Sequence, residues 1–287
     1  MHGTPARWSQ VVLLLVAVAG LVGSGCSAGP PGRPARPLAS VAPHRPGVAG
    51  ARGAAAPAMH PTLPTVVDHG RRDSGMVALT FDSNMTDAML AELDRHQVAS
   101  FDNRAVIDEL VAARVPATFF LAGKWVERYP QETRRIVANP LFEVGSHSYA
   151  HRAFRPPCYG LGGLAVAAMA ADVARSEALL RRFTPHPTNY FRFPGGCFDR
   201  AALRAIAPTG VRVIQYDVAS GDAFGTSVRR IVTHTLAQTR AGSIVVMHIT
   251  GGNTAPLTAR ALPAIVAGLR ARGLRLVRLS TMLAAGA

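Results

Sequence analysis

The stretch Val77-Ala78-Leu79-Thr80-Phe81-Asp82 runs from five largely apolar residues directly into a carboxylate. A short apolar run of this length is typical of a strand that is buried on both faces. Further along the chain, similar runs alternate with segments of helical periodicity. Strands that alternate with helices indicate a parallel sheet. The sequence therefore predicts an α/β fold.

Six further runs predict strands, and five segments between the runs predict helices. The strands are expected at 117–121, 142–146, 190–193, 211–215, 244–247 and 274–278, and the helices at 104–114, 131–138, 164–183, 226–240 and 258–272. Seven strands within residues 75–287 favour a distorted parallel (β/α) barrel. An open doubly wound sheet is the alternative.

Titratable or cationic side chains lie at or just after the ends of five expected strands. They are Asp82, His147, Arg192, Asp217, Asp222 and His248. In parallel β/α barrels the carboxyl ends of the strands meet at one rim, and the active site forms there. We therefore expect these side chains to converge.

Each of these residues also has an ordinary structural interpretation. Asp82 could cap a helix, Arg192 could be a surface arginine before a turn, and His248 could be a core residue. His147 and His151, which lie four residues apart, could be solvated, but two imidazoles at this spacing can also bind one metal ion. Their common position at strand ends favours the chemical interpretation: a histidine metal site, a carboxylate base and a histidine acid.

The N-terminal region predicts an exported protein. Arg7 precedes an apolar run at 11–22 and small residues before Cys26, which together are typical of a signal peptide over 1–25. The small residues resemble a bacterial lipobox, so we expect lipid on Cys26 and attachment to a membrane surface; an ordinary signal peptide is the alternative. Residues 26–74 are rich in Pro, Ala and Arg and predict a flexible tether, leaving 75–287 as the folded domain.

The formal net charge of +14 favours acidic partners such as anionic lipid or cell-wall polymer. A compositional bias toward Arg would produce the same charge without any partner. Hydrophobic residues make up 48% of the chain and charged residues 17%, which excludes global disorder. We expect no nucleic-acid partner.

Several motifs resemble those of the polysaccharide deacetylases of carbohydrate esterase family four, the NodB-homology domain. The resemblance covers about residues 76–283. The motifs, in chain order, are Leu79-Thr80-Phe81-Asp82, the strand 115–121 with Gly123, Gly145-Ser146-His147-Ser148-Tyr149-Ala150-His151, Arg192-Phe193-Pro194-Gly195-Gly196, the segment 217–222, and the segment 244–248. The histidine motif is specific to this family, and the occurrence of all these motifs in the same order is more specific still.

The resemblance implies a distorted barrel and a divalent metal, zinc or alternatively cobalt, held by His147, His151 and a carboxylate; imidazole ligands also suit nickel. It implies that Asp82 is the base that activates water and that Arg192 holds it. It also implies that His248 protonates the leaving amine while Asp222 tunes His248. The expected substrate is an N-acetylated polysaccharide, either peptidoglycan or a chitin-like polymer.

The sequence departs from the family pattern directly after Asp82. The family has a second Asp there as its third metal ligand, whereas this chain has Ser83. We take Asn84 as the third ligand, with Ser83 and Asp87 as alternatives. The loss of one negative charge predicts weaker metal binding. A glycan-binding protein without catalysis, or an O-acetyl esterase, is therefore an alternative function.

Two cysteines, Cys158 and Cys197, follow the histidine motif and the arginine motif at the expected rim. An oxidising exterior permits a disulfide between them. We expect it to join the two loops and to stabilise the fold by about 3–4 kcal/mol. Two free buried thiols are the alternative.

Overall fold

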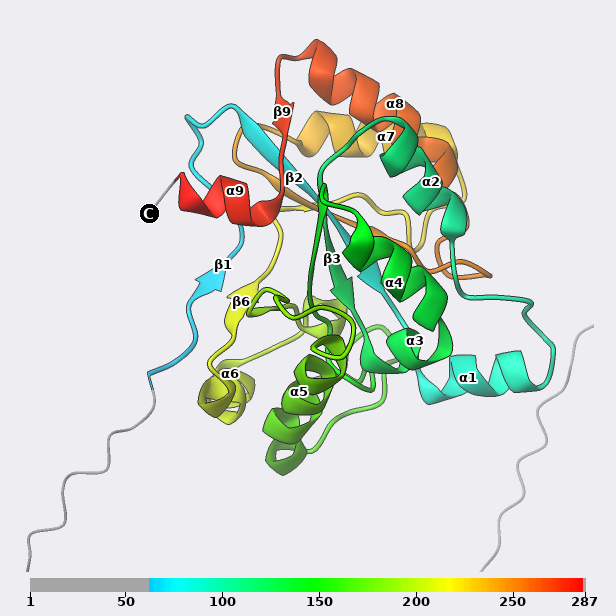
Figure 1. Cartoon of the computed structure of the whole chain (residues 1–287), viewed down its shortest axis with the longest axis vertical. Helices are drawn as coiled ribbons and strands as arrows, with labels where there is room; N and C mark the ends of the chain where they lie inside the picture. Colours follow the sequence, from blue (N-terminus) through cyan, green and yellow to red (C-terminus); the bar gives the residue numbers. More distant parts are fainter. Residues whose placement is uncertain (1–61, 286–287) are drawn as a thin grey trace, which may run out of the picture. The chain divides into compact units, whose positions relative to one another are not determined.

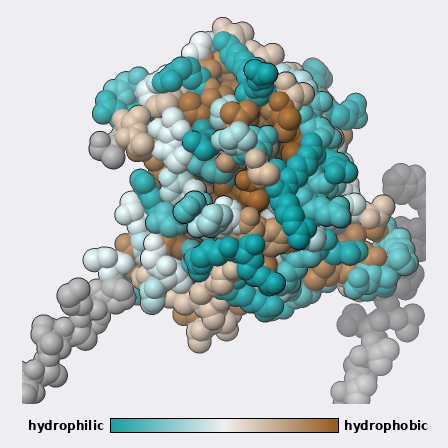
Figure 2. Space-filling view, viewed as in Figure 1, coloured by the Kyte–Doolittle hydropathy of each residue, from teal (hydrophilic) through white to brown (hydrophobic). Residues whose placement is uncertain are grey.

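The computed structural model describes residues 62–285 of the chain. The expected signal peptide at 1–25, the lipidation site at Cys26 and residues 26–61 of the expected tether lie outside the described residues. The described part forms a compact unit of helices around a parallel sheet (Figure 1). None of its helices has both the length and the apolar character needed to cross a membrane. Hydrophilic side chains alternate with apolar patches on the face drawn in Figure 2.

The strands form one sheet in which every strand pair is parallel, as predicted. In spatial order the strands are β1 (Val66–Val67), β6 (Arg212–Ile214), β5 (Tyr190–Phe191), β4 (Phe142–Ser146), β3 (Ala117–Leu121), β2 (Met76–Ser83), β8 (Ile244–His248) and β7 (Val218–Ala219), and β9 (Arg275–Leu276) pairs with the start of β2. This sheet curls into a half-barrel. The predicted distorted α/β barrel is confirmed, with β1 and β7 as additional two-residue strands.

The expected boundary between tether and domain at residue 74 is wrong. Val66 and Val67 pair with Val213 and Ile214 of β6, and His69 forms a bridge with Ser243 just before β8. Two β-branched residues are too few to show a strand period, but they add to the exposed edge of β6. The domain therefore begins before residue 66 and not at residue 75.

Most of the helices pack against the outside of the sheet, whereas α9 (Leu279–Ala284) packs against β2 and covers one end of the half-barrel. The others are α1 (Asp87–Asp94), α2 (Arg104–Ala112), α3 (Gly123–Arg128), α4 (Pro130–Ala138), α5 (Val166–Leu180), α6 (Arg200–Ile206), α7 (Val228–Gln238) and α8 (Thr258–Ala271). In Figure 1, α2, α7 and α8 lie together on one side, and α5 and α6 lie on another. The short helices α3, α6 and α9 were not predicted.

The alternation of side chains along β2 determines on which side of the sheet Asp82 lies. Leu79 and Phe81 face the helices and pack in the large core cluster with Phe119 of β3. Because successive side chains point to opposite faces, Thr80 and Asp82 face the interior of the half-barrel. Leu279 and Met282 of α9 fill the other end of that interior. The carboxylate therefore reaches the rim from inside the barrel, as a parallel barrel requires.

Candidate active site

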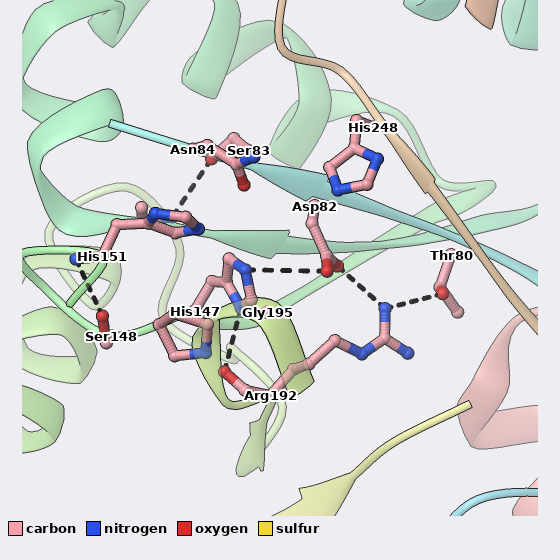
Figure 3. A network of polar contacts seen from close by, with 12 residues as sticks. Thr80, Asp82, Ser83, Asn84, His147, Ser148, His151, Arg192, Gly195 and His248 are labelled. Carbon is pink, nitrogen blue, oxygen red and sulfur yellow. Dashed lines mark hydrogen bonds and ion pairs between the residues drawn. The ribbon is translucent and has the colours of Figure 1, made fainter. Parts of the chain in front are cut away.

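A buried ion pair between Asp82 and Arg192 lies at the centre of the site. Nη1 of Arg192 donates hydrogen bonds of 2.8 Å to Oδ1 of Asp82 and to Oγ1 of Thr80 (Figure 3). Arg192 is fully buried, and Asp82 is 4% exposed. The structure therefore excludes a surface arginine at this position. Asp82 caps no helix either, because Thr86 caps α1 by accepting from the backbone N–H of Met89.

The guanidinium of Arg192 is held on all sides. Its Nε donates to the carbonyl of Ile214 at 3.2 Å, and its Nη2 donates to the carbonyl of Gln215 at 3.1 Å. The ring of Phe120 lies 4.0 Å below the guanidinium carbon. These contacts at the ends of β6 and β3 fix the planar fork in one orientation. Arg192 therefore holds Asp82 in one place and compensates its charge.

His147 is held as a neutral imidazole. Its Nδ1 lies 2.9 Å from the carbonyl oxygen of Arg192, and because a carbonyl can only accept, Nδ1 carries the proton. Burial lowers the pKa of His147, although the Asp82 carboxylate acts in the opposite direction. The other ring nitrogen, Nε2, lies 3.6 Å from Oδ2 of Asp82. A backbone carbonyl on one nitrogen and a lone pair on the other is the usual arrangement of a metal-binding histidine.

His151 lies beside His147, with ring centroids 5.0 Å apart. Both of its ring nitrogens are buried and have no hydrogen-bond partner among the described residues. Burial and then the neighbouring His147 lower the pKa of His151 well below 6.5. Its backbone φ of 50° lies in the left-handed region, which costs a non-glycine residue about 1–2 kcal/mol. An imidazole that has no hydrogen-bond partner and is held in this strained backbone conformation is suited to bind a metal ion.

The loop between the two histidines is held by Asp172 of α5. Its carboxylate accepts the backbone N–H of Tyr149 at 2.8 Å and that of Ala150 at 3.1 Å. The hydroxyl of Ser148 accepts the N–H of His151 at 3.0 Å. Asp172 was not predicted, because it lies more than twenty residues beyond the motif on an apparently ordinary helix.

The three candidates for the third metal ligand have different surroundings. The Ser83 hydroxyl accepts the backbone N–H of Ala122 at 3.1 Å, and Asp87 pairs on the surface with Lys124 and Arg152. Asn84 differs, because its Oδ1 is buried and has no partner in the described part of the chain. Asn84 lines the same pocket as both histidines. One ring nitrogen from each histidine and Oδ1 of Asn84 fit a metal site with two nitrogen ligands and one neutral oxygen ligand.

No group of three or more His, Cys, Asp or Glu residues within 62–285 has the arrangement of a metal site. The amide oxygen of Asn84 does not belong to any of these residue types. Burial without partners is costly for a carboxamide oxygen, at about 1–3 kcal/mol. A bound cation would satisfy that oxygen and both histidines.

Asp222 and His248 form a second ion pair opposite Asp82. Nδ1 of His248 lies 2.8 Å from Oδ1 of Asp222, which also accepts from Ser220, and Oδ2 accepts the hydroxyl of Thr258 and the backbone N–H of His248. Burial would raise the pKa of Asp222, but the charge of His248 and these hydrogen bonds lower it. Burial would lower the pKa of His248, but the charge and hydrogen bond of Asp222 raise it. His248 is thereby kept protonated to higher pH.

The predicted site residues line one pocket of about 260 Å³. Asp82, Asn84, His147, His151, Asp222 and His248 all belong to its wall. Arg192 lies behind Asp82 and has no exposed surface. Asp217 lies elsewhere: it accepts from Arg72, Ser243 and the backbone N–H of Ile244, and so it has a structural role at the start of β8.

Cys158 and Cys197 form a disulfide, which confirms the predicted pairing. It links positions 39 residues apart and joins the loop after His151 to the loop after Arg192. Gly195 makes this approach possible, because a Cβ on it would lie 2.6 Å from Sγ of Cys158. The disulfide therefore links two loops whose neighbouring residues, Tyr159 and Gly195, line the pocket.

Known proteins similar in sequence include carbohydrate deacetylases. The chain is 27% identical over 177 residues to a peptidoglycan-N-acetylglucosamine deacetylase of Bacillus cereus, covering 62% of each protein. It is 30% identical over 179 residues to a chitooligosaccharide deacetylase of a Bradyrhizobium species, covering 58% of this chain and 78% of the relative. The chain thus spans less than two thirds of the length of the Bacillus cereus relative.

Solved structures share the fold. A peptidoglycan N-acetylglucosamine deacetylase has a TM-score of 0.64 at 24% identity, covering 76% of this chain and 92% of that one. A carbohydrate esterase family four pseudoenzyme from Bacillus anthracis has a TM-score of 0.61 at 22% identity, covering 77% and 69%. At this identity the likeness establishes the fold alone.

The family model for polysaccharide deacetylases matches residues 69–214, about half of the chain. The match includes β2 with Asp82, the histidine motif and Arg192. It begins at residue 69, inside the segment that we expected to be a tether. The chain therefore belongs to the polysaccharide deacetylase family.

Proposed function

We propose that the protein removes N-acetyl groups by hydrolysis from an envelope or extracellular polysaccharide, peptidoglycan or a chitin-like polymer, with a divalent metal. One observation carries this proposal. Asp82, held by Arg192, and His248, held by Asp222, line the same pocket as two neutral histidines. This pocket thus combines a base, an acid and a pair of metal-binding side chains.

The metal would be held by His147, His151 and Asn84. Two imidazoles favour zinc, cobalt or nickel. When bound, such a metal supplies Lewis-acid polarisation of the acetyl carbonyl and lowers the pKa of water. The neutral state of both histidines leaves their lone pairs available for it.

The residues of the chain would carry the proton transfers. The Asp82 carboxylate accepts a proton from the attacking water, and the hydrogen bond from Arg192 keeps that carboxylate oriented. His248 donates its proton to the nitrogen as the amide C–N bond breaks, so that acetate and an amine leave. The raised pKa of His248 suits this role, because the imidazolium must be present near neutral pH.

A glycan-binding protein without turnover is the second candidate. The observation in its favour is Ser83, whose hydroxyl is bonded to the backbone of the next strand and supplies no charge to the metal site. One neighbour in fold is a pseudoenzyme by name. Retention of the base, its arginine and the acid–carboxylate pair supports catalysis, since binding alone requires none of them.

Acetate release from peptidoglycan and from chitin oligomers, with and without added zinc, tests the proposal. We expect metal-dependent release that disappears in Asp82→Asn. Asp87→Asn is a matched control, because its carboxylate lies five residues further along and forms only surface ion pairs. No acetate from either polymer with zinc, cobalt or nickel would exclude deacetylation, and glycan binding without turnover would support the second candidate.

We also propose export and membrane attachment through lipid on Cys26. The support is the sequence of residues 1–26, and the net charge of +14 would favour acidic wall polymers. Cell fractionation of the wild type beside Cys26→Ala tests this. The wild type is expected in the membrane fraction and the variant in the soluble one; identical distributions would contradict lipid attachment.

A further inference from the structure

Within residues 62–285, the two most exposed of the large hydrophobic side chains lie together at the pocket. Phe224 is 74% exposed and Tyr159 is 71% exposed, and both line the pocket that holds Asp82 and His248. Their ring centroids are 5.4 Å apart, with 37° between the ring planes. Single exposed apolar residues are ordinary, but two adjacent exposed aromatic rings in the wall of one pocket are typical of a binding site.

Both rings are carried by backbone that lies close to anchored residues. Tyr159 directly follows Cys158, which is bound to Cys197 by the disulfide. Phe224 lies two residues after Asp222, whose carboxylate accepts four hydrogen bonds. A Cβ at Gly195 would approach the ring of Tyr159 to 3.1 Å, so glycine leaves room for the ring. Anchored backbone on both sides reduces the entropy that binding would cost.

The size of the pocket indicates what the pair contacts. At about 260 Å³ the pocket is smaller than typical ligand sites of roughly 300–1,000 Å³, so a polymer chain must continue beyond it. The two rings form part of the pocket wall and, because they are largely exposed, offer flat apolar faces to a ligand that extends out of the pocket. The C–H faces of a pyranose ring match such surfaces, while its hydroxyl groups remain in water.

We propose that Tyr159 and Phe224 form a stacking subsite for the sugar ring next to the one that carries the reacting acetyl group. This assignment rests on the proposed function for the identity of the polymer. The pair would set the preferred chain length and would add affinity without touching the reacting atoms. The loop disulfide would position one half of the subsite.

Calorimetric titration with N-acetylglucosamine oligomers of one, two and four sugars tests the subsite. Phe224→Ala and Tyr159→Ala are expected to weaken binding of the two- and four-sugar ligands about two- to tenfold each and to leave the single sugar unchanged. Phe224→Trp, which keeps an aromatic face, is expected to retain the affinity. Val166→Ala, which removes an apolar side chain that is 55% exposed at the start of α5, is the matched control.

Three results would overturn the subsite: unchanged affinity in both alanine variants, equal loss for the single sugar, or no oligomer binding by the wild type. Acetate release is measured separately. If the wild type binds oligomers in the expected way and releases no acetate, the subsite stands and the deacetylase proposal fails. If acetate is released but the aromatic variants bind oligomers normally, the deacetylase proposal stands and the subsite fails.

Discussion

Arg192 donates a hydrogen bond of 2.8 Å to Asp82 from a position with no solvent exposure. Breaking a buried pair by removal of one partner typically costs about 3–5 kcal/mol, because the other charge is left uncompensated. We expect Arg192→Met to lower the free energy of unfolding by about this amount and to abolish acetate release. Urea denaturation and the acetate assay measure the two effects.

Arg152→Met is the control for Arg192. Arg152 pairs with Asp87 on the surface, where an ion pair contributes about 1 kcal/mol or less. An unfolding free energy equally affected in both variants would contradict the central role of the buried pair.

We expect Asp222→Asn to change the pH dependence of activity. The carboxylate of Asp222 raises the pKa of His248, so its neutralisation lowers that pKa. Since His248 must be protonated to act as an acid, activity in the variant is expected to decline at lower pH than in the wild type. The rate profile between pH 5 and 10 measures the shift, in the range of about one pH unit. A lower rate at every pH with no shift of the alkaline limb of the rate profile would contradict the role of Asp222 in raising the pKa of His248.

The same pair makes stability depend on pH, with a sign set by the two pKa shifts. His248 has a raised pKa when folded, so its contribution is complete below 6.5 and is lost as pH rises through the higher folded value. Asp222 has a lowered pKa, so its contribution is present above 3.8 and is lost as pH falls through the lower folded value. The stability difference between the wild type and Asp222→Asn should therefore be largest between these two reference values, as denaturation at several pH values would show.

Asn84 variants test the third ligand directly. Asn84→Ala removes the partnerless oxygen and is expected to weaken zinc binding at least about tenfold. Asn84→Asp adds a negative charge at the same place and is expected to strengthen zinc binding. Zinc titration of purified protein measures both without any substrate. Equal affinities in the two variants would show that position 84 does not contact the metal.

Asp172→Ala tests the support of the histidine loop. Two backbone N–H groups between His147 and His151 lose their acceptor in this variant. Loss of such supporting partners typically lowers metal affinity about 10- to 100-fold. Glu177→Ala, further along α5, is the control. If the two variants bind zinc equally well, the loop does not depend on Asp172.

The sequence predicted β2, β4, β5 and β8, which carry or directly precede Asp82, the histidine motif, Arg192 and His248, because each is a short run typical of a buried strand with a titratable or cationic residue at its end. It did not predict β1 and β7, since two-residue strands such as Val218–Ala219 have no measurable period and form only through pairing with a neighbour. For the same reason the start of the domain was placed too late. Such elements depend on tertiary contacts and not on local preference.

The contacts around the site residues could not be predicted from the sequence either. Asn84 was the preferred third ligand, with Ser83 and Asp87 as alternatives. The sequence did not show that Ser83 contacts Ala122 or that Asp87 pairs with Lys124 and Arg152, which lie far away in the chain. Asp172 and Thr258 hold the histidine loop and Asp222 from helices with no motif of their own. Long-range hydrogen bonds of this kind leave no periodic signal.

The disulfide between Cys158 and Cys197 has a consequence for how the protein can be produced. The loops it joins extend from the histidine motif and from the arginine motif, and one of them carries Tyr159. In a reducing cytoplasm the barrel can form through its core while these loops remain unlinked. Preparations from cytoplasmic expression would then contain folded molecules that differ in thiol content, and the oxidised fraction should be isolated before affinities are compared.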